Sequence, residues 1–260
     1  MRSLALLTVL VLLFACVPFA SAETAERLDD STLLSFYDNG VFFGDSRMEA
    51  FKRYVDGVQQ TDPSFLGKTT IVAAGSISLY AASRTYPSGD FLFYYRGRQL
   101  HMYGVAERVN PTRIFIMLGL NDPIAAKPDK GIEYVKIIID KMNETVPGAR
   151  VYFFSETPVT ENFGEEKDRP EYQDQLDVYN AMLKETCEQN GAYYIELAES
   201  LKGEDNFLRL DYSNDRVCHL NEDGIGVWIQ VMKDYAQQQY ELGLWDPYAD
   251  GNPATPTDLP

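Results

Sequence analysis

Short apolar runs alternate along the chain with longer stretches in which apolar residues recur at helical spacing. After the first run, for example, Met48, Phe51, Val55 and Val58 fall on one face of a helix. Strands that alternate with helices predict an α/β fold, with a mostly parallel five-stranded sheet and helices on both faces. The apolar runs have the length and composition of buried strands, and they lie at residues 40–44, 69–75, 113–119, 151–154 and 192–197.

The polar connections between these runs carry further signals. We expect helices over residues 100–109 and 172–187, and a last helix that begins after Asn221, whose side chain is suited to cap it. The aromatic residues 91–95 precede a turn at residues 96–98, which predicts a small hairpin or a lid. Packing in the core is the simpler interpretation of each of these aromatics.

A chain of 260 residues can bury one good core, and we expect one large domain over residues 35–245. Residues 1–22 have the charged start, apolar run and small-residue cleavage site of a signal peptide, which predicts secretion. A weaker pattern that ends at Cys16 leaves a lipid anchor as the alternative. Residues 23–34 are predicted to be a polar, loosely held lead-in, and residues 246–260 a flexible tail.

The formal net charge of −16 narrows the choice of partners. So acidic a chain repels nucleic acid and anionic membrane surfaces, and a small molecule or a carbohydrate is the better candidate. We expect no stable membrane insertion once the signal peptide is removed. Cys187 and Cys218 flank a predicted strand, so they should lie at opposite ends of the sheet, too far apart for a disulfide.

Candidate chemistry lies directly after three of the predicted strands. Ser46 follows the first strand, Gly75 ends the second, and Asn121 follows the third. The carboxyl ends of parallel strands meet at one edge of a sheet, where active groups gather. Ser46 is either a helix cap or a nucleophile, and a nucleophile needs a base. His219, in a loop before the last helix, is the better candidate base, since His101 is expected to be a surface or packing residue.

Four short segments carry a resemblance to a known family. They resemble, in order and spacing, the four blocks of the SGNH (GDSL-type) hydrolases: Gly44-Asp45-Ser46-Arg47, Gly75, Gly119-Leu120-Asn121-Asp122, and Asp215 with His219. The resemblance implies a three-layer, flavodoxin-like fold and the hydrolysis of an ester or thioester. It also implies that Ser46 is the nucleophile and His219 the base. The backbone amides of Ser46 and Gly75 and the side-chain amide of Asn121 would form the oxyanion hole.

One position departs from the family pattern. The family's aspartate lies three residues before the histidine, and that position here is Arg216, with Asp215 one residue further back. Either the loop bulges so that Asp215 completes a triad, or a backbone carbonyl orients His219 and leaves a dyad. Arg47 stands where the family name has leucine. We expect no metal or cofactor, because neither a metal-ligand cluster nor a glycine-rich phosphate loop is evident in the sequence.

The leading functional prediction is a secreted serine esterase that acts on a small acyl group, O-acetyl on a carbohydrate. Export and acidic charge favour a carbohydrate, on whose rings the aromatics of residues 91–95 can stack. A lysophospholipase or thioesterase with the same residues is a close alternative. A non-catalytic carbohydrate-binding protein on the same fold is the alternative from another class, and the displaced Asp215 favours it.

Overall fold

The structure is a computed structural model that describes residues 27–84, 92–166 and 171–249. The predicted signal peptide with Cys16, most of the predicted tail, and residue 91 of the aromatic block lie outside the described residues.

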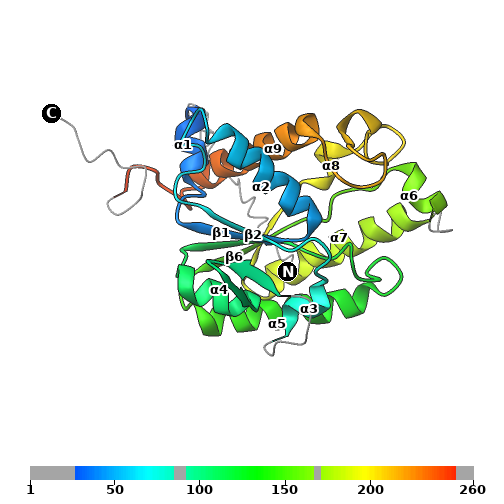
Figure 1. Cartoon of the computed structure of the whole chain (residues 1–260), viewed down its shortest axis with the longest axis horizontal. Helices are drawn as coiled ribbons and strands as arrows, with labels where there is room; N and C mark the ends of the chain where they lie inside the picture. The colour runs from blue at the N-terminus through cyan, green and yellow to red at the C-terminus, as the bar shows by residue number, and fades with distance from the viewer. Residues whose placement is uncertain (1–26, 85–91, 167–170, 250–260) are drawn as a thin grey trace, which may run out of the picture.

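A parallel sheet of five strands forms the middle layer (Figure 1). Gly44 at the end of the first strand is paired with Ala73 on one side and Met117 on the other, so three strands end together at one edge. The α/β fold class and the parallel sheet predicted from the sequence are confirmed. The strand order is β2 (Thr70–Ala73), β1 (Gly40–Gly44), β5 (Arg113–Met117), β6 (Arg150–Phe154) and β7 (Tyr193–Ile195).

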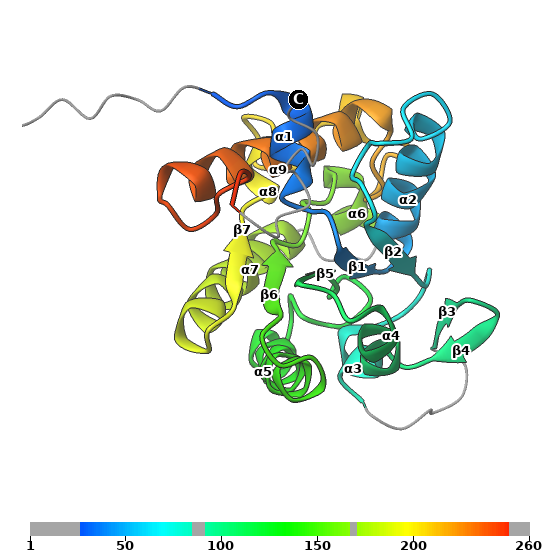
Figure 2. The same cartoon turned by 90° about the vertical axis from the view of Figure 1, so that its left-hand side faces the viewer.

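Helices cover both faces of this sheet, as Figure 2 shows from the side. Neighbouring residues of β1 divide between the faces, since Phe42 packs in one core cluster and Phe43 in the other. The Phe42 face packs against α1 (Asp30–Ser35), α2 (Ser46–Val58), α8 (Ala198–Leu201) and α9 (Glu222–Glu241). The Phe43 face packs against α3 (Leu79–Ser83), α4 (Met102–Val109), α5 (Pro128–Thr145) and α7 (Tyr172–Gln189).

The segment before the sheet contains a helix that the sequence analysis did not predict. Asp29 caps α1 through its side chain, and Leu33 and Leu34 are both buried against the α9 side of the sheet. Just beyond α1, the Tyr37 hydroxyl donates a hydrogen bond of 2.8 Å to a backbone carbonyl of α9. The prediction of a loosely held lead-in is wrong here, because adjacent leucines behind a good cap dock even a short helix.

The aromatic block forms a hairpin of β3 (Phe93–Tyr95) and β4 (Arg98–Leu100). Both turn residues have positive φ, +47° at Arg96 and +78° at Gly97, as a two-residue hairpin turn requires. Phe93 is fully buried and its ring lies 5.4 Å from that of Phe43, whereas 68% of Tyr94 is exposed. The block is therefore partly core packing and partly surface.

Three smaller predictions can be compared with the structure. His101 caps α4, because its Nδ1 accepts a hydrogen bond of 3.0 Å from the Gly104 amide, which makes it a structural residue. Cys187 and Cys218 are both buried, free thiols. Within the described part of the chain, no helix has the length and apolar character needed to cross a membrane.

Two more elements lie in the described parts of the chain: α6 (Glu161–Glu166) and a 3-10 helix, η1 (Leu210–Tyr212), which leads into the loop before α9.

Candidate active site

Ser46 lies on a tight turn between β1 and α2. Asp45 caps the helix by accepting a hydrogen bond of 3.0 Å from the Arg47 amide, and Ser46 is the first helical residue. The turn depends on Gly44, because a Cβ there would lie 2.4 Å from the Cβ of Met48 and 3.0 Å from the Met117 carbonyl. Glycine allows the helix to start immediately at the edge of the sheet. The Ser46 hydroxyl is thereby held at the carboxyl end of β1.

His219 comes to Ser46 from a loop far along the chain. The Ser46 Oγ lies 2.8 Å from Nε2 of His219, and the Nδ1 of the same ring lies 2.5 Å from Oδ2 of Asp215. Hydroxyl, imidazole and carboxylate thus form one continuous hydrogen-bonded chain. Of the two arrangements left open by the sequence, the geometry is that of a triad, with Asp215 and not a backbone carbonyl on the ring.

A bulge in the loop lets Asp215 reach the ring in spite of the additional residue. Arg216 takes the left-handed conformation, with a φ of +62°. The loop then wraps around the other carboxylate oxygen of Asp215, which accepts hydrogen bonds from the backbone amides of Val217 (2.8 Å), Cys218 (3.0 Å) and His219 (3.2 Å). Asp215 is therefore held by the backbone and presents Oδ2 to the imidazole.

The pKa values of Asp215 and His219 are shifted in opposite directions. Partial burial raises the pKa of Asp215, but hydrogen bonds from the His219 ring and from the loop amides outweigh it and lower the pKa to about 2. The Cys218 sulfur, 3.8 Å from Nδ1, and the Asp215 carboxylate raise the pKa of His219 to about 9, against the effect of burial. The pair favours a protonated ring beside an ionised carboxylate.

Of the three groups predicted to form the oxyanion hole, the amides of Ser46 and Asn121 already have acceptors. The Ser46 backbone amide donates to the Gly75 carbonyl at 3.1 Å. The Asn121 side-chain amide donates to the Ile77 carbonyl at 3.1 Å and lies 3.5 Å from Oδ2 of Asp45. An anion at Ser46 would have to take these two donors from the protein groups that they now contact. Their role in an oxyanion hole stays a prediction.

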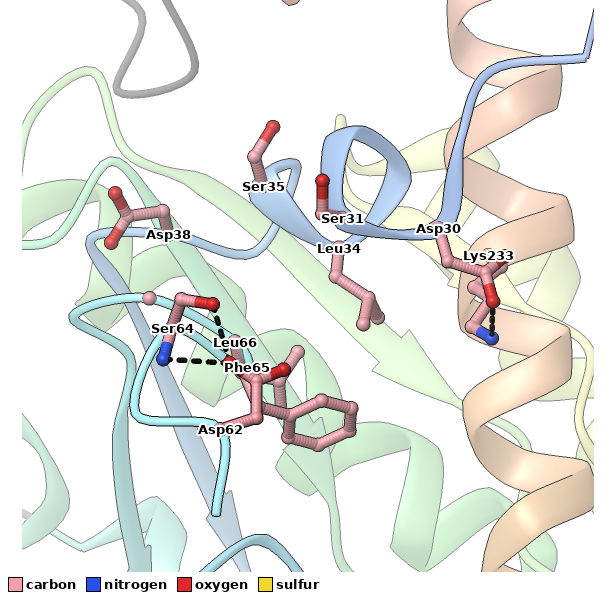
Figure 3. A pocket seen from close by; sticks show the side chains of 11 residues that line it. Asp30, Ser31, Leu34, Ser35, Asp38, Asp62, Ser64, Phe65, Leu66 and Lys233 are labelled. Atoms are coloured by element: carbon pink, nitrogen blue, oxygen red, sulfur yellow. Dashed lines mark hydrogen bonds and ion pairs between the residues drawn. The ribbon is translucent and has the colours of Figure 1, made fainter. Parts of the chain in front are cut away.

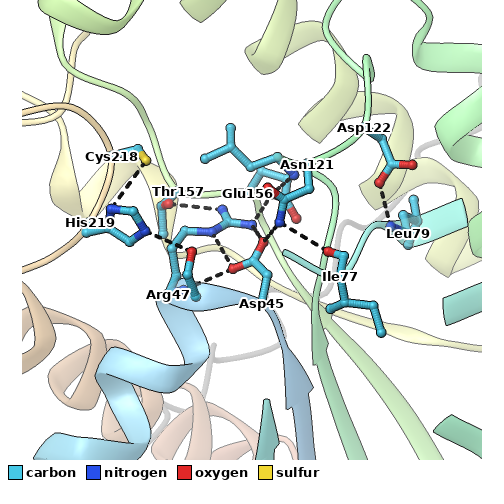
Figure 4. A network of polar contacts seen from close by, with 12 residues as sticks. Asp45, Arg47, Ile77, Leu79, Asn121, Asp122, Glu156, Thr157, Cys218 and His219 are labelled. Carbon is cyan, nitrogen blue, oxygen red and sulfur yellow. Dashed lines mark hydrogen bonds and ion pairs between the residues drawn. The ribbon is translucent and has the colours of Figure 1, made fainter. Parts of the chain in front are cut away.

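The residues on either side of Ser46 in the chain, Asp45 and Arg47, belong to a buried ion-pair network with Glu156 (Figure 4). Arg47 is 2% exposed, and its guanidinium contacts Asp45 (2.7 Å) and Glu156 (2.7 Å). Burial alone would lower the pKa of Arg47, but the two carboxylates outweigh it and raise the pKa. For Glu156 the balance is reversed, because burial raises the pKa more than Arg47 lowers it.

The network also holds the loop that carries Asn121. Glu156 accepts a hydrogen bond of 3.1 Å from the Leu120 amide, and Asp45 approaches the side chain of Asn121 itself. The next residue, Asp122, accepts hydrogen bonds from the first amides of α3, at 2.5 Å from Leu79. The sequence analysis named Arg47 but missed Glu156 as its partner. The available signal was that each lies within three residues of the carboxyl end of a buried strand in a parallel sheet, where charged groups of opposite sign can meet.

Two cavities flank the sheet at opposite ends. One, of about 440 Å³, is lined by α1 and the loop before β2 and lies at the amino ends of the strands (Figure 3). It is therefore remote from Ser46. The other, of about 430 Å³, is lined by Asn121 and by Tyr80 and Tyr134, whose ring centroids are 5.3 Å apart. This second cavity, the Asn121 cavity, adjoins the candidate site at Asn121.

Comparison with known proteins supplies a family and a fold. The model of the GDSL-like lipase/acylhydrolase family matches residues 42–225. A GDSL-like lipase from Bacteroides thetaiotaomicron has a similar structure (TM-score 0.55, 14% identity, covering 76% of this chain and 87% of that one).

Two carbohydrate esterases are similar in the same way. One is a mutant acetyl-xylooligosaccharide esterase from Geobacillus Stearmophilus (TM-score 0.51, 14% identity, 78% of this chain and 93% of that one). The other is a family 3 carbohydrate esterase from Clostridium thermocellum (TM-score 0.52, 13% identity, 79% and 98%). At these identities the likeness shows the fold alone. Curated protein sequences give no match.

Proposed function

The chain belongs to the GDSL-like lipase/acylhydrolase family, and from this membership we propose that it is a serine esterase that removes a small acyl group, O-acetyl, from a carbohydrate. The family resemblance drawn from four short segments is thereby confirmed, and membership of this family implies an ester hydrolase activity. The serine mechanism, the acyl group and the carbohydrate are the parts that we propose. The observation that supports the serine mechanism is the hydrogen-bonded chain from the Ser46 hydroxyl through His219 to Asp215.

The proposed reaction begins with attack of the Ser46 Oγ on the ester carbonyl. A neutral hydroxyl is a poor nucleophile, so Nε2 of His219, 2.8 Å away, takes its proton as the bond forms. Asp215 keeps the remaining ring proton on Nδ1 and stabilises the imidazolium that results. The imidazolium then protonates the departing alcohol. A water molecule, activated by the same ring, hydrolyses the acyl-enzyme and restores Ser46.

The tetrahedral intermediate in this proposal needs amide donors. Ser46 and Asn121 supply them by exchanging a carbonyl partner, Gly75 or Ile77, for the substrate oxyanion. The exchange is favourable because an anion is a stronger acceptor than a neutral carbonyl. Each such donor typically contributes 10²–10³ in rate. The Gly75 amide completes the proposed hole.

The Asn121 cavity supports a carbohydrate as the rest of the substrate. Its Tyr80 and Tyr134 rings offer flat apolar surface beside polar groups, an arrangement that suits a sugar ring. Two proteins of similar fold carry names that refer to acetyl-xylooligosaccharides and to carbohydrate esters. The net charge of −16 disfavours nucleic acid as a partner. We propose export through residues 1–22, with a lipid anchor at Cys16 as the alternative.

Two measurements test the proposal. A fluorophosphonate should label the wild-type protein at Ser46 and should not label Ser46→Ala, whereas the exposed Ser64→Ala control should react like the wild type. A folded wild type that does not react would support the non-catalytic binding protein. A series of p-nitrophenyl esters, with acetylated oligosaccharides as a second substrate, then measures acyl length. Faster cleavage of long acyl chains than of acetyl would support a lysophospholipase or thioesterase.

A further inference from the structure

We propose that Asp215, Cys218 and His219 form a binding site for a zinc ion, and that the bound ion switches off the base of the active site. In the described parts of the chain, this is the one place where three metal-ligating side chains gather, with their ligand atoms all within 4.8 Å of one another. The ligand set is a carboxylate, a thiolate and an imidazole. The soft thiolate and the borderline imidazole favour Zn²⁺, which also accepts a carboxylate, over Mg²⁺ or Ca²⁺, which prefer oxygen alone.

The spacing of the ligand atoms is close to what zinc requires. Bonds of about 2.3 Å to sulfur and about 2.1 Å to nitrogen at a tetrahedral angle place the two atoms about 3.6 Å apart. The Sγ of Cys218 and the Nδ1 of His219 are 3.8 Å apart. The Oδ2 of Asp215 is nearer to Nδ1, at 2.5 Å, and would move outward by about 1 Å to make room for the ion. Both side chains are about one-third exposed and have space for this movement.

The loop already supplies the outer contacts that a metal ligand needs. The second oxygen of Asp215 accepts hydrogen bonds from the amides of Val217, Cys218 and His219, so Oδ2 alone is left for the ion. Fixed outer partners of this kind orient the ligands of natural metal sites. The left-handed Arg216 brings the three ligands of this five-residue loop to one side. The fourth tetrahedral position stays open to water.

Zinc at this site would disable the base through the protonation state of the ring. Binding releases two protons to solvent, one from the Cys218 thiol and one from His219 Nδ1, and the ion takes the lone pair that this leaves on Nδ1. The neutral ring then carries its single proton on Nε2, the atom that faces the Ser46 Oγ. A nitrogen that already bears a proton cannot accept one from the hydroxyl. This consequence rests on the proposed function, whereas the metal site itself does not.

Cobalt is the probe that tests the site without reference to activity. Titration of the reduced wild-type protein with Co²⁺ should produce thiolate-to-cobalt charge-transfer absorption and tetrahedral d–d bands, with one ion bound per chain. Cys218→Ser should lose the charge-transfer band, and the matched control Cys187→Ala should keep it, because Cys187 is fully buried at the far end of α7. A wild-type spectrum without the thiolate band would overturn the proposal, even if the protein proves to be an active esterase.

Zinc inhibition tests the consequence. Ester hydrolysis by the wild type should fall as Zn²⁺ is added and should recover with EDTA. Each variant is compared with its own rate in the absence of zinc. The zinc concentration for half inhibition should rise by about 100-fold or more in Cys218→Ser and should not change in Cys187→Ala. Equal inhibition of Cys218→Ser and the wild type would show that the thiolate is not a ligand and would refute the site. If no ester is cleaved at all, the cobalt spectra still decide whether the site exists.

Discussion

Replacing Arg47 with methionine tests whether its buried network with Asp45 and Glu156 stabilises the fold as an ion-pair network. Methionine keeps the apolar part of the side chain and removes the guanidinium. Asp45 and Glu156 then lose the partner that contacts each of them at 2.7 Å, and both carboxylates are only 1% exposed. Removing one partner of a buried ion pair typically costs about 3–5 kcal/mol, because a charge stays buried without compensation.

We expect the free energy of unfolding to fall by about 4 kcal/mol in Arg47→Met. The presence of two carboxylates argues for a larger loss, and the raised pKa of Glu156, which lets it take up a proton, argues for a smaller one. Domains of this size lose roughly 2–4 °C of Tm per kcal/mol, so Tm should fall by about 8–16 °C. Most proteins have only about 5–15 kcal/mol of stability in total, which makes this loss large.

Urea unfolding followed by tryptophan fluorescence measures the effect, since Trp228 and Trp245 are both buried. The matched control is Arg53→Met, an exposed arginine on the same helix, which should change stability by less than about 0.5 kcal/mol. The double variant Arg47→Met/Glu156→Gln should be less destabilised than the sum of the two single variants, by about 1–3 kcal/mol. A stability of Arg47→Met within about 1 kcal/mol of the wild type would refute the reasoning.

Three further predictions concern the proposed reaction. Asp215→Asn should lower kcat by up to about 10⁴-fold by favouring the wrong ring tautomer, and a nearly normal kcat would show that another group orients His219. Asn121→Ala should lower kcat by about 10²–10³ with little change in KM, whereas a loss below tenfold would exclude Asn121 from the oxyanion hole. His219 must be neutral to accept a proton, and its pKa is raised to about 9. We therefore expect kcat/KM to rise with pH and to reach half of its maximum near pH 9. A midpoint at or below pH 7 would contradict this assignment.

Much of this fold could be predicted from the sequence, because strand and helix periods are local signals. The apolar run of residues 113–119 contains β5, and the position of Ser46 after residues 40–44 follows from the same pattern. Helix α1 was missed because two leucines in a polar segment give too short a period to recognise. Their burial depends on α9, almost two hundred residues later in the chain.

The sequence could identify the individual residues of the site but not the contacts between them. Ser46 and His219 stand out because of a turn and of the rarity of histidine, and the structure brings them to 2.8 Å. Whether Asp215 reaches the ring depends on the φ of Arg216, which a sequence motif does not specify. The pairing of Arg47 with Glu156 joins residues 109 positions apart and depends on the order of the strands. The contacts that occupy the Asn121 amide likewise arise from the tertiary structure.

The proposed nucleophile and base lie on different kinds of structure: Ser46 is in a tight turn between β1 and α2, and His219 is in a loop before α9. Ser46 closely follows β1, which is paired on one side with β2 and on the other with β5, so a change in chain length between β1 and Ser46 would displace the hydroxyl from this edge of the sheet. The loop that carries His219 lies outside the sheet and is held by an isolated bridge between Ser213 and Leu220 and by hydrogen bonds from Thr160 to backbone carbonyls of the loop. This loop can accommodate an additional residue, as it does at Arg216, because a single left-handed residue absorbs the extra length. Sequence drift in such a protein should therefore accumulate as insertions and deletions around the base, while the spacing around the serine stays rigid.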